Sequence, residues 1–220
     1  VGQALGRNSK PNDIKNIYYT LAQDFIYPNP KDNVIFLDNH DTDRFYSTVG
    51  KDIRKYKLGF TLLMVNRGIP QMYYGFEINL YGSRKKGDAD IRKDFPGGWL
   101  EDKRSAFIKN GRTNEENEIW EFCSRLLNWR KGNSTIHNGH TMQFIPLKDG
   151  IYSIFRYDEE KVIGLIINPS EEKVVIQSNR YDELTHGQKN YLDIVDGKIK
   201  KWENKINIPP VGFRLIEFKL

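Results

Sequence analysis

The chain has 220 residues, of which 38% are hydrophobic, and this length suffices for one large domain or two smaller domains with a buried core. Its 34 Lys and Arg residues are only slightly more numerous than its 29 Asp and Glu residues and form no basic block, so we expect no nucleic-acid partner. No segment contains the roughly 20 apolar residues that a membrane span requires, so we expect no membrane partner either.

Helices and strands are predicted to alternate over the first 75 residues. A helix over about residues 12–26 ends before Pro28, and a short apolar strand begins at Val34. A second helical pattern covers Ile53–Val65, and a second strand follows Gly68. The apolar run of the first strand indicates burial on both faces, as in parallel sheets. Because the repeat has the length of βαβ units, roughly 30 residues, we expect parallel strands that belong to a larger sheet.

A long stretch rich in Gly and charge, residues 75–113, is predicted to be a functional or flexible connection. Within it, the ring of Trp99 either stacks on a sugar ring or base or packs onto the domain. A helix is then predicted over residues 115–130, and its apolar stripe contains Cys123, which we expect to be a buried structural thiol. This single cysteine excludes an internal disulfide and a Cys-based metal site, and four scattered histidines argue against zinc.

From about residue 140 the apolar pattern changes from helical spacing to alternation. Seven short runs separated by turn residues indicate an antiparallel sandwich or barrel. We place the boundary near Gly132 and predict two domains, residues 1–132 and residues 133–220. The predicted strands are Met142–Leu147, Ile151–Tyr157, Val162–Asn168, Val174–Gln177, Tyr191–Val195, Ile199–Ile208 and Phe213–Phe218.

A cluster of polar residues, Asp38–Arg44, follows the first predicted strand directly. In parallel α/β folds the carboxyl ends of the strands line the ligand site. The carboxylate of Asp41 can accept hydrogen bonds from two neighbouring hydroxyls, and His40 can donate to a third, which suits a sugar. Metal binding through His40, Asp41 and Asp43 is disfavoured because adjacent residues of a strand point to opposite faces. A purely structural role for these residues stays open, and no nucleophile elbow for a Ser-His-Asp triad is visible.

At these residues the chain resembles the α-amylase family of glycoside hydrolases. The segment Phe36–Asp41, Phe-Leu-Asp-Asn-His-Asp, is similar to the Phe-x-x-Asn-His-Asp motif of the family's seventh barrel strand. The segment Gly68–Glu77 is similar to the Gly-Ile-Pro-x-x-Tyr-Tyr-Gly-x-Glu motif of the eighth strand. Arg92 and the segment Asp94–Trp99 resemble a loop of the neopullulanase and cyclomaltodextrinase branch. The resemblance implies α/β plus all-β structure: the C-terminal part of a (β/α)8 TIM barrel, from its sixth to its eighth helix, followed by an antiparallel β-sandwich.

The resemblance also implies retaining cleavage of α-glucosidic bonds in starch-derived oligosaccharides, with one carboxylate as nucleophile and a second as acid/base. By the motif match, Asp41 is a third, transition-state-stabilising carboxylate, and His40 binds the same sugar. Arg44 is expected to bind substrate, with a brace for the loop as the alternative. No stretch resembles the motifs that carry the nucleophile and the acid/base, so we expect a fragment that is inactive alone and that needs the missing N-terminal part of the same enzyme as its partner.

The expected substrate is an α-glucan or maltooligosaccharide, and no cofactor is predicted. Calcium occurs in many relatives, but no ligand set is assigned here. A periplasmic or secreted location is favoured over a cytoplasmic one, although the compartment is left open. The alternative function is a non-catalytic carbohydrate-binding or assembly module built around the β-domain.

Overall fold

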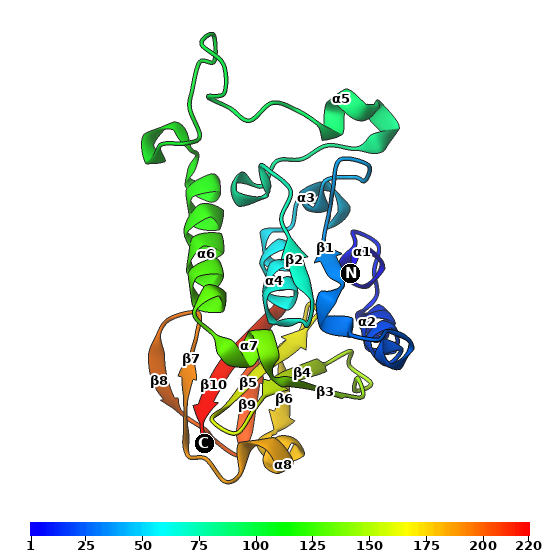
Figure 1. Cartoon of the computed structure of the whole chain (residues 1–220), viewed down its shortest axis with the longest axis vertical. Helices are drawn as coiled ribbons and strands as arrows, with labels where there is room; N and C mark the ends of the chain where they lie inside the picture. The colour runs from blue at the N-terminus through cyan, green and yellow to red at the C-terminus, as the bar shows by residue number, and fades with distance from the viewer.

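Two parallel strands, β1 (Val34–Phe36) and β2 (Ile69–Gln71), form the centre of the first half of the chain in the computed structural model, which describes residues 1–220. Helix α4 (Ile53–Val65) connects them, and helix α6 (Asn114–Lys131) follows β2 (Figure 1). The predicted βαβ unit is therefore confirmed. Shorter elements surround it: α1 (Gly2–Leu5), η1 (Pro11–Ile14), α2 (Lys15–Leu21), η2 (Asp24–Ile26), η3 (Pro30–Asp32), α3 (Phe45–Thr48), η4 (Phe76–Ile78), η5 (Arg84–Lys86), α5 (Asp88–Ile91) and η6 (Lys109–Gly111).

Local side-chain caps fix where the two long helices begin. The carboxylate of Asp52 accepts hydrogen bonds from the backbone N–H groups of Arg54 and Lys55 at the start of α4. At the start of α6, Thr113 and Glu116 form a reciprocal capping box. Both caps satisfy backbone donors that the helix itself leaves unpaired.

The predicted helix over residues 12–26 is partly wrong, because this segment is divided into η1, α2 and η2. Ile14, Ile17 and Leu21 are buried as the pattern indicates, whereas Phe25 is 85% exposed. No residue of η2 is buried, so the last predicted turn has no apolar contact that would stabilise a continuous helix. Instead Asp24 forms an ion pair with Arg67.

The expectation that β1 is buried on both faces is also wrong. Ile35 packs against the core beneath the sheet, but Val34 and Phe36 are exposed on the opposite face. Ile69 of β2, which is paired with Val34, is exposed on the same face. Figure 1 shows α4 behind the two strands and no helix in front of them, so only one face of this sheet is covered.

The second half of the chain is an antiparallel β-domain, as predicted. A six-stranded sheet has the order β3-β4-β5-β10-β7-β8, and β6 pairs with β9 in a separate small sheet. The predicted run Ile199–Ile208 is divided into two strands, because Trp202 packs edge-on against Phe218 and the chain turns there. The strands are β3 (His140–Phe144), β4 (Tyr152–Tyr157), β5 (Lys161–Asn168), β6 (Val174–Gln177), β7 (Asn190–Asp193), β8 (Lys198–Lys201), β9 (Lys205–Ile208) and β10 (Gly212–Lys219), and the short helices α7 (Ser134–Asn138), η7 (Ser178–Tyr181) and α8 (Asp182–Thr185) were not predicted.

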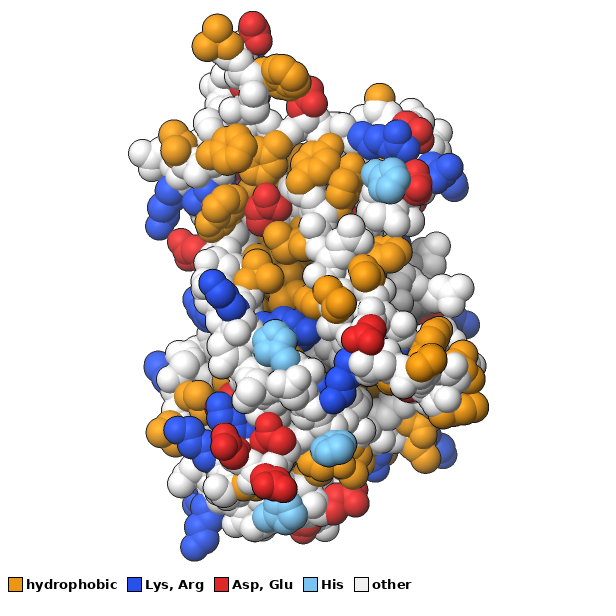
Figure 2. Space-filling view, viewed as in Figure 1, with side chains coloured by type: hydrophobic (Ala, Val, Ile, Leu, Met, Phe, Trp, Pro, Cys, Tyr) orange, Lys and Arg blue, Asp and Glu red, His pale blue; other side chains and the backbone are white.

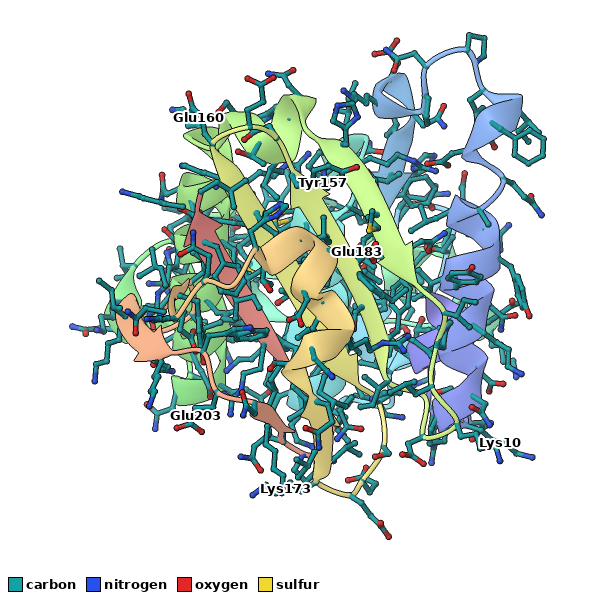
Figure 3. All side chains as sticks on the ribbon, turned by 90° about the horizontal axis from the view of Figure 1, so that it is seen from below. Lys10, Tyr157, Glu160, Lys173, Glu183 and Glu203 are labelled. Atoms are coloured by element: carbon teal, nitrogen blue, oxygen red, sulfur yellow. The ribbon has the colours of Figure 1, made fainter.

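Successive side chains of the central strands point to opposite faces of the sheet, and apolar residues on both faces form two hydrophobic layers. On one face Leu165 and Leu215 join a cluster of 28 buried residues that includes the apolar side of α4 and α6. On the other face Ile166 and Ile216 join a cluster of 11 residues beneath α8, β6 and β9. Figure 3 shows α8, which carries Glu183, lying across this second face of the sheet. The first cluster runs across the predicted boundary at residue 132, so the two halves of the chain share one core.

None of the helices has the length and apolar character that crossing a lipid bilayer requires.

Candidate functional site

The polar cluster forms a tight turn directly after β1. The side-chain oxygen of Asn39 accepts a hydrogen bond from the backbone N–H of Asp41 at 2.9 Å, and the backbone N–H of Asn39 donates to Thr42 Oγ1 at 3.0 Å. This turn brings two neighbouring side chains to the same side, with His40 Nε2 at 3.2 Å from Asp41 Oδ2. The argument that adjacent residues point to opposite faces is therefore wrong for this pair, because both residues lie beyond the strand.

Both side chains are open to a ligand. The His40 side chain is 62% exposed and the Asp41 side chain is 55% exposed. The structure contains no group of three or more His, Cys, Asp or Glu residues that could hold a metal ion. A donor ring and an acceptor carboxylate at this separation can hydrogen-bond to neighbouring hydroxyls of one small polar ligand.

A buried ion pair supports the turn from below. Asp38 Oδ2 accepts a hydrogen bond from Arg44 Nε at 3.2 Å and another from the backbone N–H of Phe45 at 2.8 Å. Burial raises the pKa of Asp38, and the hydrogen bonds from Phe45 and Arg44 oppose that rise. The Asp38 carboxylate therefore links the start of the turn to its end at Arg44 and Phe45, and it does so in the protein interior.

Arg44 is only 1% exposed, and each nitrogen of its guanidinium donates a hydrogen bond inside the protein. Besides Asp38, it donates to the carbonyl oxygens of Ile91 and Tyr74, and it lies 4.5 Å from the centre of the Tyr73 ring. Of the two roles left open by the sequence, this geometry supports the brace and gives no support to contact with a substrate. Arg44 also joins the tip of β1 to the residues that follow β2.

The segment after β2 lies beside the turn. Tyr74 is partly exposed and its hydroxyl donates to the carbonyl oxygen of Lys93 at 2.9 Å, while Tyr73 is half-buried. Burial raises the pKa of Glu77, and its Oε2 atom is buried without a hydrogen-bond partner. Both tyrosine rings also lie against the Arg44 guanidinium, and these contacts favour packing roles for the two tyrosines.

Two arginines of the long loop after β2, Arg84 and Arg92, contact the turn that follows β1. Arg92 Nε donates to the carbonyl oxygen of His40 at 2.9 Å, and Arg92 Nη2 lies 3.2 Å from Asp41 Oδ1. Arg84 donates to the carbonyl oxygen of Asp41, and its backbone N–H donates to Asp43 Oδ1 at 2.5 Å. No pattern in the sequence predicted these contacts, although Arg92 lies in the loop segment quoted for the family resemblance.

Farther along the same loop, Trp99 is 63% exposed, so most of its surface is not packed onto the domain. Its turn is ordered by Asp102, whose Oδ2 atom accepts hydrogen bonds from the backbone N–H groups of Gly97 at 2.6 Å and Trp99 at 3.2 Å. Figure 2 shows hydrophobic side chains gathered over the upper part of the molecule, where this loop lies; Leu100, Phe107 and Ile108 are also exposed. Of the two roles left open for Trp99, this exposure gives little support to packing onto the domain.

Comparisons with known proteins agree with this architecture. Residues 6–126 match the family description "Alpha amylase, catalytic domain", and residues 141–217 match "Cyclo-malto-dextrinase C-terminal domain". A cyclomaltodextrin glucanotransferase of Geobacillus stearothermophilus is 33% identical over 171 residues, which are 78% of this chain and 21% of that protein. A maltogenic α-amylase of Bacillus acidopullulyticus is 29% identical over 154 residues, 68% of this chain and 24% of that protein. The chain thus spans about a quarter of the length of these curated relatives.

Solved structures confirm the fold class. The γ-CGTase of alkalophilic Bacillus clarkii superposes with a TM-score of 0.71 at 23% identity, covering 100% of this chain and 31% of that one. An α-amylase of Geobacillus thermoleovorans superposes with a TM-score of 0.72 at 18% identity, covering 98% of this chain and 45% of that one. The unit β1-α4-β2-α6 is accordingly part of a TIM barrel, and an antiparallel β-domain follows it.

Proposed function

The chain belongs to the α-amylase family of glycoside hydrolases, and from this premise we propose that its β1 tip forms part of an active site that cleaves α-glucosidic bonds in starch-derived oligosaccharides. The observation that carries the proposal is the exposed pair of His40 and Asp41 at the carboxyl end of a barrel strand, the end where active sites of this fold lie.

In this proposal Asp41 is the transition-state-stabilising carboxylate and His40 donates a hydrogen bond to the same sugar. Retaining cleavage of a glycosidic bond passes through a flattened, oxocarbenium-like ring. Hydrogen bonds from ring hydroxyls to Asp41 that become stronger as the ring flattens lower the barrier, because they stabilise the transition state more than the bound substrate. Arg44 acts beneath them as a brace.

We further propose that the nucleophile and the acid/base come from residues outside these 220, as parts of the same enzyme. Support comes from the open face of the two-stranded sheet, where Val34, Phe36 and Ile69 are exposed. Beside β1, a groove of about 330 Å³ is lined by residues of β1, α2 and α4. Parallel strands are normally covered on both faces, so further barrel strands are the natural occupants of this surface.

The test is the substitution Asp41→Asn in an enzyme that contains these residues together with the nucleophile and acid/base. We expect kcat on maltooligosaccharides to fall about 100-fold or more, because the lost group acts in the transition state. The urea midpoint should stay unchanged, since an exposed side chain contributes little to the core. Asp149→Asn, in the exposed turn between β3 and β4, is the matched control and should leave both quantities unchanged.

Near-normal turnover of the Asp41→Asn variant would refute the proposed role. Maltooligosaccharide binding without any hydrolysis by the unmodified enzyme would favour the alternative, a non-catalytic carbohydrate-binding or assembly module.

A further inference from the structure

We propose that the groove between β2 and α6 binds an acidic side chain from the part of the same enzyme that supplies the neighbouring barrel strand. This inference rests on the proposed function, because it takes the rest of the barrel to lie outside these 220 residues. It adds the chemistry of the contact, in which a carboxylate enters a basic groove and neutralises the buried guanidinium of Arg130.

The groove has a volume of about 340 Å³ and an unbalanced charge. Four of its eight lining residues are Lys, Arg or His, and none is Asp or Glu. Figure 2 shows a hollow on this face of the molecule, with Lys or Arg and His side chains at its lower end. A surface of this composition favours an anionic partner. The lining residues are Lys31, Gly68, Ile69, Pro70, Leu127, Arg130, Lys131 and His137.

Arg130 carries the charge that most needs a counter-charge, because this residue is only 5% exposed. Its Nη1 atom donates to the carbonyl oxygen of Met64 at 2.5 Å, and its Nη2 atom donates to that of Gly68 at 2.9 Å. These bonds satisfy backbone oxygens at the end of α4, but they leave the net charge in place. Burial lowers the pKa of Arg130, which reflects the cost of a cation held away from water without a carboxylate.

The two other buried arginines in the first half of the chain have the counter-charge that Arg130 lacks. Arg44 pairs with Asp38, and Arg67 pairs with Asp24, so in both cases the chain itself supplies the carboxylate. Arg130 forms no ion pair within the chain. It differs from the other two in lying beside the free edge of β2, where a further segment can reach it.

The other basic groups of the groove contact backbone oxygens only. Lys31 Nζ donates to the carbonyl oxygen of Asn138 at 2.5 Å, and His137 Nε2 donates to that of Arg130 at 2.8 Å. Neither residue forms an ion pair, and Lys131 forms none either. An acidic side chain that entered the groove would therefore displace no existing ion pair.

The topology indicates which part of the enzyme reaches this groove. Strand β2 pairs with β1 on one side only, and after α6 the chain enters the β-domain, so β2 is the last barrel strand. In a closed barrel of eight parallel strands the last strand pairs with the first. The first strand then runs parallel to β2 along its free edge. Because the groove adjoins Gly68–Pro70, at the amino end of β2, the acidic residue lies at or just before the amino end of that first strand.

The test introduces an amine into the groove of the complete enzyme through the substitution Arg130→Lys. A water-soluble carbodiimide joins an amine to a carboxylate without a spacer, so it links only groups that are in contact. We expect mass spectrometry of the peptides to find position 130 joined to an Asp or Glu near the amino end of the first barrel strand. The unmodified enzyme is the matched control and should give no link at this position, because a guanidinium does not form this bond.

Three results of the cross-linking would overturn the inference. They are the absence of any link at position 130, a link only to residues within these 220, and a link between two copies of the enzyme, seen as a doubled mass.

A double-mutant cycle tests the same contact through stability, because Arg130 also binds the end of α4. Arg130→Met and the change of the linked acid to its amide should each lower the urea midpoint of the complete enzyme. Together they should lower it no further than Arg130→Met alone, since each removes the same ion pair. Arg125→Met, an exposed position of α6 outside the groove, is the control and should add to the effect of the amide. Additivity for Arg130→Met as well would overturn the inference and leave Arg130 with its contacts to α4 only.

The outcomes distinguish this inference from the proposed function. The absence of a link at position 130, together with a collapse of kcat in Asp41→Asn, would overturn the inference and leave the proposed function standing. A link to the first strand together with normal turnover of Asp41→Asn would refute the role of Asp41 and support the groove as the place where the barrel closes.

Discussion

Replacement of Arg44 by methionine tests whether the candidate site is built on the buried ion pair beneath it. The Arg44 and Asp38 side chains are 1% and 3% exposed, and Arg44 Nε lies 3.2 Å from Asp38 Oδ2. Methionine fills much of the same volume but removes the charge and every donor. The carboxylate of Asp38 then keeps only the backbone N–H of Phe45, and the carbonyl oxygens of Tyr74 and Ile91 lose a partner.

The expected loss in the free energy of unfolding is about 3–5 kcal/mol, the usual effect of removing one partner of a buried pair. A Coulomb estimate agrees, since unit charges at this distance attract with about 5 kcal/mol at an effective dielectric constant of roughly 20. A comparable exposed pair is worth only about 0–1 kcal/mol. The buried position of Arg44 therefore accounts for the difference between the two expected magnitudes.

The loss should also depend on pH, with a sign set by Asp38. Burial already raises the pKa of this carboxyl, and without Arg44 the pKa rises further. Between the unfolded pKa, about 3.9, and the raised folded pKa, the folded state binds more protons, so the free energy of unfolding falls as pH rises. The loss in the free energy of unfolding caused by Arg44→Met should accordingly be smaller at pH 5 than at pH 7.5.

Urea unfolding of the purified chain at both pH values measures the free energy of unfolding and so tests this prediction, with Arg54→Met as the control. Arg54 is 47% exposed and pairs with Asp52 and Glu171 at the surface, so its loss should cost about 0–1 kcal/mol without change between the two pH values. Adding Asp38→Asn to Arg44→Met should recover part of the stability, because no uncompensated charge remains. A loss below about 1 kcal/mol, or one equal at both pH values, would refute the argument.

Two further predictions concern the long loop and the core. In an enzyme that also contains the nucleophile and acid/base, Trp99→Ala should lower kcat/KM on maltoheptaose about threefold to tenfold relative to maltotriose, because one aromatic contact to a distant sugar is lost. Leu100→Ala should not have this effect, and equal losses on both substrates would contradict the prediction. Burial raises the pKa of the Cys123 thiol, so iodoacetamide at pH 8 should label the chain only at the rate of its unfolding; rapid labelling of the folded chain would contradict its burial.

Sequence patterns predicted the elements whose causes are local. The alternation of apolar residues defined the strands of the β-domain, and the apolar stripe of α6 correctly placed Cys123 in the core. The division of residues 198–208 into two strands was missed, because it depends on Trp202 packing against Phe218 across the sheet. Helix α2 ends at Leu21, earlier than predicted, because no apolar surface is present to receive the following turn.

The site was predictable only in part, because several of its contacts join segments that are distant in the sequence. The motif placed His40 and Asp41 at the end of a strand, but their proximity depends on a turn stabilised by Asn39. Whether Arg44 faces solvent or the interior depends on Asp38 and on segments distant in the sequence, so the two roles could not be separated beforehand. Arg92 contacts the turn across 51 positions, a separation at which spacing carries no signal.

The open face of the two-stranded sheet does not weaken the support of the site. Val34 and Phe36 project from β1 into solvent, whereas Ile35 between them packs into the cluster of 28 buried residues that joins α4 and α6 to the β-domain. The tip of β1 thus rests on a core shared with the second half of the chain, and Arg44 and Arg92 hold it from the side of β2 and its loop. Substitution of the outward residues should leave the turn intact, because none of its hydrogen bonds depends on them. The Asp41 carboxylate is therefore held without any contribution from the outward residues of β1, as its proposed role in an active site requires.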